Sequence, residues 1–140
     1  MARFINDIQD EIIEEFEIVE DWTSRYQLLV DYGKALKPLP ESDKTKQNLI
    51  DGCQSPVWLT CRVEDGKIFF AGDSDALLVK GIVALLIEVL SGHTPEEITK
   101  ADLYFIDRIG LREHLSPTRS NGVAAMLKQM KLYALAYKSM

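Results

Sequence analysis

Residues 76–90 are almost entirely apolar and are interrupted by two charged residues and Gly81. A stretch of this length and composition predicts a helix that is apolar on most sides, and such a helix belongs at the buried centre of a domain. The polar run Asp73-Ser74-Asp75 is expected to cap its start, and Ser91-Gly92 to end it. Because Gly81 lowers helix propensity by roughly 1 kcal/mol relative to Ala, we expect another backbone to pack closely against it. The stretch is too short to span a bilayer.

Amphipathic helices are predicted before and after this central helix. Apolar residues recur at steps of three and four over residues 4–19, with acidic side chains on the solvated face. A second helix is expected to begin after the cap residue Asp21 and to end or kink at Gly33. A capping box opens a short helix at Thr94, and Ser116-Pro117 opens the last helix. The apolar stripe of the last helix predicts core packing and comprises Val123, Met126, Leu127, Met130, Tyr133, Ala134 and Tyr137.

A β-hairpin is predicted between these helices. Residues 57–63 alternate between two faces, as a strand does, and Asp65-Gly66 suits a type I′ turn. Residues 67–71 are expected to form the return strand, and residues 49–50 a short third strand, because a lone hairpin is marginally stable. The sequence therefore predicts an α+β fold, with a small antiparallel sheet of about three strands packed against several helices. We expect one domain spanning residues 1–140.

The charge and cysteine content exclude several classes of protein. A formal net charge of −6, from 16 basic and 22 acidic residues, argues against a nucleic-acid-binding protein, which needs clustered Lys and Arg. The first residues run directly into an acidic amphipathic stretch, so no secretory signal is expected. Two cysteines eight residues apart form no disulfide framework. These features predict a reduced, cytoplasmic protein with neither a membrane nor a nucleic-acid partner.

The two cysteines occupy different settings in the sequence. Cys61 shares a strand face with Val57 and Leu59 and is therefore expected in the core. Cys53 follows Gly52 on a polar loop, and glycine frees the backbone to expose a neighbouring side chain. A loop cysteine alone is a weak signal, because most cysteines are small buried hydrophobic residues. If one cysteine carries out chemistry, it is Cys53.

Metal and phosphate sites are not favoured by the sequence. His93 and His114 are twenty-one residues apart and are expected at the surface, and no Cys-x-x-Cys or His-x-x-x-His pair occurs. No glycine-rich loop joins a strand to a helix. Arg119 lies in a polar cluster near the positive end of a helix dipole, which on its own indicates an ordinary capped helix entry. A loop thiol can still attack another sulfur without a metal, cofactor or dedicated base.

Four motifs, in order along nearly the whole chain, resemble the SufE family. They are Gly52-Cys53-Gln54-Ser55-x-Val57-Trp58, Asp73-Ser74-Asp75-Ala76, Lys80-Gly81 and Leu115-Ser116-Pro117-Thr118-Arg119-Ser120-Asn121-Gly122. The resemblance implies a protein that accepts sulfur from a SufS-type cysteine desulfurase, stimulates that enzyme and passes the sulfur to a downstream Fe–S scaffold complex. Such a protein is a sulfur-transfer partner rather than a stand-alone enzyme. Pyridoxal phosphate belongs to the desulfurase, and neither a cofactor nor a metal is expected on this chain.

The resemblance also implies roles for individual residues. Cys53 would accept the persulfide, Gly52, Gln54 and Ser55 would form its loop and contribute to partner docking, and Arg119 would help to dock the desulfurase or to steady the thiolate. The loop is expected to be partly sheltered in the free protein and to open toward the partner, because shelter protects a persulfide from reductants and oxidants. The implied fold is similar to that of the IscU-type cluster scaffolds. Association into a homodimer is left open.

One position departs from the family pattern, and two other functions remain open. Pro56 stands where the family commonly has glutamine; proline removes a backbone donor and biases Ser55 toward extended geometry, which puts the mobility of the loop in question. One alternative is an IscU-like Fe–S scaffold, which would need about three or four cysteine-type ligands. The other is a regulatory module that binds the desulfurase through its helices and needs no thiol.

Overall fold

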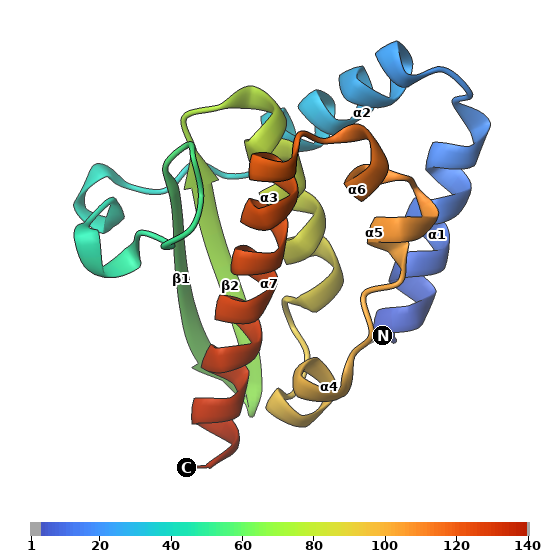
Figure 1. Ribbon diagram of the computed structural model, residues 1–140. Coiled ribbons are helices and arrows are strands. Elements are labelled where there is room, and N and C mark those ends of the chain that lie inside the picture. The colour runs from blue at the N-terminus through green and yellow to red at the C-terminus, as the bar shows by residue number, and fades with distance from the viewer. Residues whose placement is uncertain (1–3, 140) are drawn as a thin grey trace.

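The apolar helix α3 (Leu77–Leu90) lies at the centre of the computed structural model, which describes residues 4–139 apart from the side chain of Thr118. Nine of its residues are buried. It packs against the strands on one side and against the helices of the chain's first and last segments on the others (Figure 1). The prediction of a buried central helix is therefore confirmed.

The other elements surround this helix in the order of the chain. They are α1 (Ile5–Ile18), α2 (Trp22–Ala35), the 3₁₀ turns η1 (Glu41–Asp43) and η2 (Lys46–Asn48), β1 (Val57–Glu64), β2 (Lys67–Ser74), α4 (Pro95–Lys100), α5 (Phe105–Arg108), α6 (Leu111–His114) and α7 (Pro117–Lys138). Buried apolar side chains from every α-helix and from both strands form one cluster. The α+β class predicted from the sequence is confirmed.

The two strands form an antiparallel hairpin in which Val57 pairs with Ser74 at one end and Glu64 with Lys67 at the other. Asp65 and Gly66 have φ values of 54° and 76°, as the predicted type I′ turn requires. The return strand extends beyond residue 71 as far as Ser74. The hairpin is stabilised because α3 covers one face of it, which supplies the burial that two strands alone lack.

The predicted third strand at residues 49–50 is wrong for the described chain, whose sheet has two strands. Leu49 forms an isolated bridge to Trp58, and the Ile50 N–H donates to the Val57 carbonyl at 2.9 Å. Pairing stops there because η2 ends directly before Leu49 and a turn begins directly after Ile50. The segment therefore closes the edge of β1 without extending the sheet.

Most of the predicted helix ends are confirmed. The Asp21 carboxylate accepts from the Ser24 N–H at the start of α2, Thr94 opens a complete capping box at α4, and the Ser116 side chain accepts from the Arg119 N–H at α7. The apolar stripe of α7 lies in the core or packs against it, as predicted.

The cap predicted for α3 is wrong. Residues 73–75 do not cap this helix; its N-cap is Ala76, and no side chain caps it. The reason is that β2 continues through Ser74, so the polar residues belong to the end of a strand.

The two histidines lie in different environments. His114 is exposed, as expected, and stacks on Trp22 with ring centroids 3.7 Å apart. His93 is 6% exposed, so the prediction of a surface position is wrong. Its backbone pairs with Ile68 at the free edge of β2, and this pairing draws the side chain into the interior.

Gly81 brings α3 into direct backbone contact with α2, as predicted. A Cβ atom at Gly81 would lie 2.0 Å from the carbonyl oxygen of Leu29, and one at Gly33 would lie 2.9 Å from the Gly81 nitrogen. Gly33 does not end α2, which continues to Ala35, but forms the other half of this contact. The two helices can therefore cross closely only because both positions lack a side chain.

Substituting Gly81 with alanine tests this contact. The added methyl group would collide with the backbone of Leu29. Overpacking costs about 1–3 kcal/mol and occasionally more, and a collision with backbone belongs at the upper end, above the gain of roughly 1 kcal/mol in helix propensity. We expect a lower free energy of unfolding in urea. Gly122→Ala is the matched control, because a Cβ on that helical glycine would lie 3.6 Å from the nearest atom, an ordinary contact. Equal or greater stability of Gly81→Ala would contradict the close crossing.

Candidate functional site

Residues 51–56, which we call the cysteine loop, connect Ile50 to the first residue of β1. The Ile50 N–H donates to the Val57 carbonyl across the base of the loop. At the carboxyl end, the Ser74 hydroxyl donates to the Pro56 carbonyl at 2.7 Å. Near the amino end, Gly52 has a φ of 92°, a conformation that favours glycine. The loop is thus held at its base and projects Cys53 from it.

Cys53 rests against the first turns of α7. Its thiol lies 3.7 Å from the Gly122 carbonyl oxygen, within reach of a weak S–H hydrogen bond, although the two residues are 69 positions apart. The thiol adjoins a small pocket of about 20 Å³ whose other lining residues are Gln54, Ser55, Val79, Ile82, Arg119, Gly122 and Met126. Apolar residues of α3 and α7 form its inner wall. Sequence reasoning missed this wall, which depends on tertiary packing.

The thiol of Cys53 is half-buried, and this burial raises its pKa above the ordinary value. Desolvation disfavours the charged form of any acid, so the resting side chain is a thiol rather than a thiolate at neutral pH. The contact with the Gly122 carbonyl agrees with this state, because a carbonyl oxygen accepts from S–H but repels S⁻. The resting site is therefore sheltered and weakly nucleophilic.

The other residues assigned to the site lie around this thiol. Gly52 and Gln54 are exposed on the cysteine loop, and Ser55 is partly buried beside the pocket. Arg119 lies in the first turn of α7 and is exposed, and its guanidinium makes no ion pair or hydrogen bond with the side chains that the structure describes. The fold thus brings Arg119 to the pocket of Cys53, with its charge directed to the surface.

Cys61 lies far from Cys53. It is half-buried on β1 and packs against the core; its burial raises the pKa of its thiol, and a hydrogen bond with Tyr137 opposes this effect. Tyr137 lies about four turns beyond Gly122 on the same helix, which corresponds to roughly 22 Å at 1.5 Å per residue. Two cysteines bridge only when their Cα atoms lie within about 7 Å. The fold therefore keeps the two thiols from forming a disulfide with each other.

A buried carboxylate, that of Asp73, lies next to the base of the cysteine loop. Asp73 is 3% exposed and accepts from the backbone N–H of Leu39 at 3.1 Å. It pairs with Lys80 at 3.2 Å and Lys44 at 3.6 Å. Burial opposes its ionisation, but the N–H groups of Ser74 and Leu39 and the Lys80 ammonium hold its pKa below the ordinary value. The ion pairs of Asp73 fix the end of β2 directly beside Ser74, whose hydroxyl holds Pro56.

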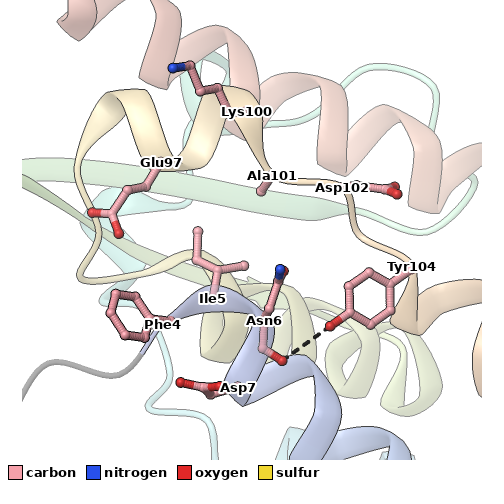
Figure 2. Close-up of a pocket in the computed structure, with 9 residues that line it drawn as sticks. All are labelled: Phe4, Ile5, Asn6, Asp7, Glu97, Lys100, Ala101, Asp102 and Tyr104. Carbon is pink, nitrogen blue, oxygen red and sulfur yellow. Dashed lines mark hydrogen bonds between the residues drawn. The ribbon is translucent and has the colours of Figure 1, made fainter.

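A wider hollow elsewhere lacks comparable chemistry. This hollow, of about 650 Å³, lies between the start of α1 and α4 (Figure 2). The Tyr104 hydroxyl there donates to the Asn6 carbonyl at 3.2 Å. Partial burial and a hydrogen bond to Asp10 raise the pKa of Tyr104 to about 12, so its hydroxyl stays protonated at neutral pH. No cysteine or histidine lines it. We therefore place the candidate site at Cys53, despite its smaller pocket.

Within residues 4–139, no three His, Cys, Asp or Glu side chains are grouped so that they could hold a metal ion. None of the helices described is long and apolar enough to cross a membrane.

Comparisons with known proteins agree on one family. The sequence model of the SufE family, described as an Fe-S metabolism associated domain, matches residues 10–134. An uncharacterized SufE-like protein of Synechocystis sp. is 45% identical over 127 residues, which cover 91% of this chain and 80% of that protein. A SufE-like protein of Rhizobium meliloti, also uncharacterized, is 40% identical over 127 residues, covering 87% of this chain and 91% of the relative.

A solved structure shares the fold. The solution structure of a hypothetical protein from Thermus thermophilus superposes with a TM-score of 0.78 at 25% identity. The match covers 95% of this chain and 97% of that one. The arrangement of helices around a small sheet is therefore that of an experimentally determined protein.

The sheltered state of Cys53 predicts how its alkylation depends on pH. In a Cys61→Ser background, we expect the rate of reaction with iodoacetamide to rise with a midpoint above the ordinary pKa of a cysteine thiol, because burial raises the pKa. Mass spectrometry of samples quenched over a range of pH measures the rate. The same protein in denaturant is the control and should titrate at the ordinary value. A midpoint at or below that value in the folded protein would show a thiolate stabilised at rest.

Proposed function

Because this chain belongs to the SufE family, whose domain is associated with Fe–S metabolism, we propose that it accepts sulfur on Cys53 from the persulfide of a cysteine desulfurase. The desulfurase would be of the SufS type, and the sulfur would pass to a downstream Fe–S scaffold complex. The observation that carries this proposal is the position of Cys53 on a loop fixed at its base and seated beside a small apolar pocket.

The transfer is an exchange between two sulfur atoms. The Cys53 thiol first loses its proton to solvent, and the thiolate attacks the outer sulfur of the desulfurase persulfide. A new S–S bond forms on Cys53 as the S–S bond of the donor breaks, and the desulfurase cysteine leaves as a thiolate that takes up a proton. Oxidation states balance, so neither an oxidant nor a reductant is needed. The pyridoxal phosphate that releases sulfur from free cysteine would belong to the desulfurase.

The resting geometry is suited to protection rather than attack. The pocket beside Cys53, at about 20 Å³, has room for roughly one atom of the size of a water oxygen, and a persulfide adds one sulfur atom. Movement of the cysteine loop toward a partner would hydrate the thiol and remove the desolvation that raises its pKa. Opening would therefore expose and activate the nucleophile in one step, and closure would shelter the product.

The distance between the two cysteines favours transfer of the sulfur to another protein. Cys61 contacts Tyr137 near the end of α7, whereas Cys53 contacts Gly122 near its start. Cys61 is therefore not placed to attack a Cys53 persulfide and release the sulfur within the chain. The carried sulfur would therefore leave to another protein. The same distance argues against an IscU-like scaffold function, because a scaffold needs several cysteine-type ligands around one cluster.

Arg119 would act on the transferring sulfur. It lines the pocket of Cys53, is exposed, and forms no ion pair with the described side chains. A guanidinium in this position can donate charge-assisted hydrogen bonds to a thiolate or a persulfide anion once the loop moves.

Incubation with a cysteine desulfurase and cysteine tests the proposal. We expect Cys53 to gain about 32 Da, the mass of one sulfur atom, as measured by mass spectrometry of the intact protein and its peptides without reductant. Cys53→Ser should abolish the gain and Cys61→Ser should retain it. A gain on Cys61 would show that the assigned roles are wrong. Stimulation of the desulfurase that survives Cys53→Ala undiminished would favour a regulatory module that needs no thiol.

Substitution of Arg119 tests its role separately. We expect Arg119→Ala to slow single-turnover sulfur transfer at saturating desulfurase by about tenfold or more, because a hydrogen bond to a charged group is worth about 1.5–3 kcal/mol. Arg119→Lys keeps the charge and should recover part of the rate. An unchanged rate at saturation, with a higher desulfurase concentration needed for half the rate, would assign Arg119 to docking alone.

A further inference from the structure

We propose that Ser74 is a positioning residue that pins the carboxyl end of the cysteine loop, so that the loop moves about its Gly52 end. Cys53 is then held in its seat, by which we mean its contact with Gly122 and the adjoining pocket. The inference rests on the proposed function only for its consequence in sulfur transfer. Ser74 is 7% exposed and is the last residue of β2, directly opposite Val57 in the hairpin. Its hydroxyl donates to the Pro56 carbonyl at 2.7 Å, immediately before β1 begins.

Pro56 gives this hydrogen bond unusual weight. Proline has no N–H, so its carbonyl is the single backbone group by which residue 56 can be held. Within the described chain, no backbone group of residues 51–55 hydrogen-bonds to another backbone group. The remaining polar tether of the loop is the weak contact of the Cys53 thiol with Gly122, at 3.7 Å. The Ser74 hydroxyl is therefore the strong polar attachment at the carboxyl end of the loop.

The anchor itself is rigid. The Ser74 N–H donates to the neighbouring Asp73 carboxylate at 2.8 Å, and that carboxylate is fixed by Lys80 at 3.2 Å. The Ser74 oxygen also lies 3.4 Å from the Ala76 N–H at the entry to α3. Because Val79 and Ile82 of α3 line the pocket of Cys53, one serine connects the loop to the helix that forms its seat.

The amino end of the loop has a different character. Gly52 is exposed, with a φ of 92°, and a Cβ placed on it would meet Ala125 of α7 at 3.4 Å. Glycine changes φ at low cost, whereas the ring of Pro56 fixes φ and restricts Ser55. Rotation is therefore easier at Gly52 than at Pro56. Pro56 therefore stiffens the end of the loop that Ser74 holds.

The rate of Cys53 alkylation, measured on the full chain and its Ser74 variants, tests this inference without a desulfurase. We expect Ser74→Ala to raise the rate of reaction with iodoacetamide about fivefold, as loss of one hydrogen bond predicts. The pH midpoint of the reaction should also fall toward the ordinary cysteine value, because the thiol spends more time in water. Ser74→Thr keeps the hydroxyl and should restore both the rate and the midpoint. Alkylation of Cys61 in the same samples is the internal reference and should not change.

Ser91→Ala is the matched control for a general loss of stability. The Ser91 hydroxyl accepts from the Phe70 N–H at 2.9 Å. This variant therefore loses one serine hydrogen bond that involves β2, the strand of Ser74, but does not touch the cysteine loop. We expect it to leave Cys53 alkylation unchanged. An equal increase in Ser91→Ala, or an unchanged rate and midpoint in Ser74→Ala, would overturn the proposal. Failure of the wild-type protein to gain sulfur would refute the proposed function but leave the alkylation result intact.

Discussion

The burial of α3 is the constraint on which the rest of the structure depends. A helix that is apolar on most sides must be covered on most sides, and here the hairpin, α1, α2 and α7 all pack against it. Two glycines allow α2 to approach until the backbones touch, because any Cβ at Gly81 would collide with Leu29. The same helix extends two side chains, Val79 and Ile82, to the surface pocket beside Cys53. The seat of the thiol is thus an outer edge of the core, and its shape is as fixed as the packing beneath it.

A thiol in such a seat is less reactive but better protected from solvent. Burial raises the pKa of Cys53 and lowers the thiolate fraction, whereas a sulfur carrier needs a thiolate at the moment of attack. The conflict is resolved if the two states belong to two positions of one loop. The described hydrogen bonds would permit such a movement: they gather at the base of the loop, at Val57 and Pro56, and leave the backbone groups of residues 51–55 without backbone partners. Packing against α7 holds the tip, and packing can be exchanged for contacts with another protein.

The sequence predicted what depends on local pattern and missed what depends on contacts between distant segments. Periodicity and capping residues were sufficient for α1, α2, α3, α4 and α7 but not for the four-residue helices α5 and α6, and Asp65-Gly66 was sufficient for the hairpin turn. The run at residues 73–75 followed the local rule for a helix cap, but Asp73 finds Lys80, Lys44 and the Leu39 N–H from other segments, and this network makes the run a strand end. His93 was misplaced for a similar reason, since an edge pairing with Ile68 buries it. Alternation separated Cys61 from Cys53, but no pattern could indicate that Gly122 would form the seat of the thiol.

The energies of these contacts explain why a loop held in this way can still move. A hydrogen bond such as that between Ser74 and Pro56 contributes about 0.5–1.5 kcal/mol net, and the thiol contact with Gly122 is weaker still. A protein that binds with a dissociation constant near 1 μM has about 8 kcal/mol of binding free energy. Diverting a small part of that energy is enough to unseat Cys53 and costs the complex little affinity. Because no second thiol lies within reach of Cys53, shelter in the seat does not compete with release inside the chain. If Cys53 carries sulfur as we propose, the strength of the seat can be set by the need to keep that sulfur from solvent until a partner docks.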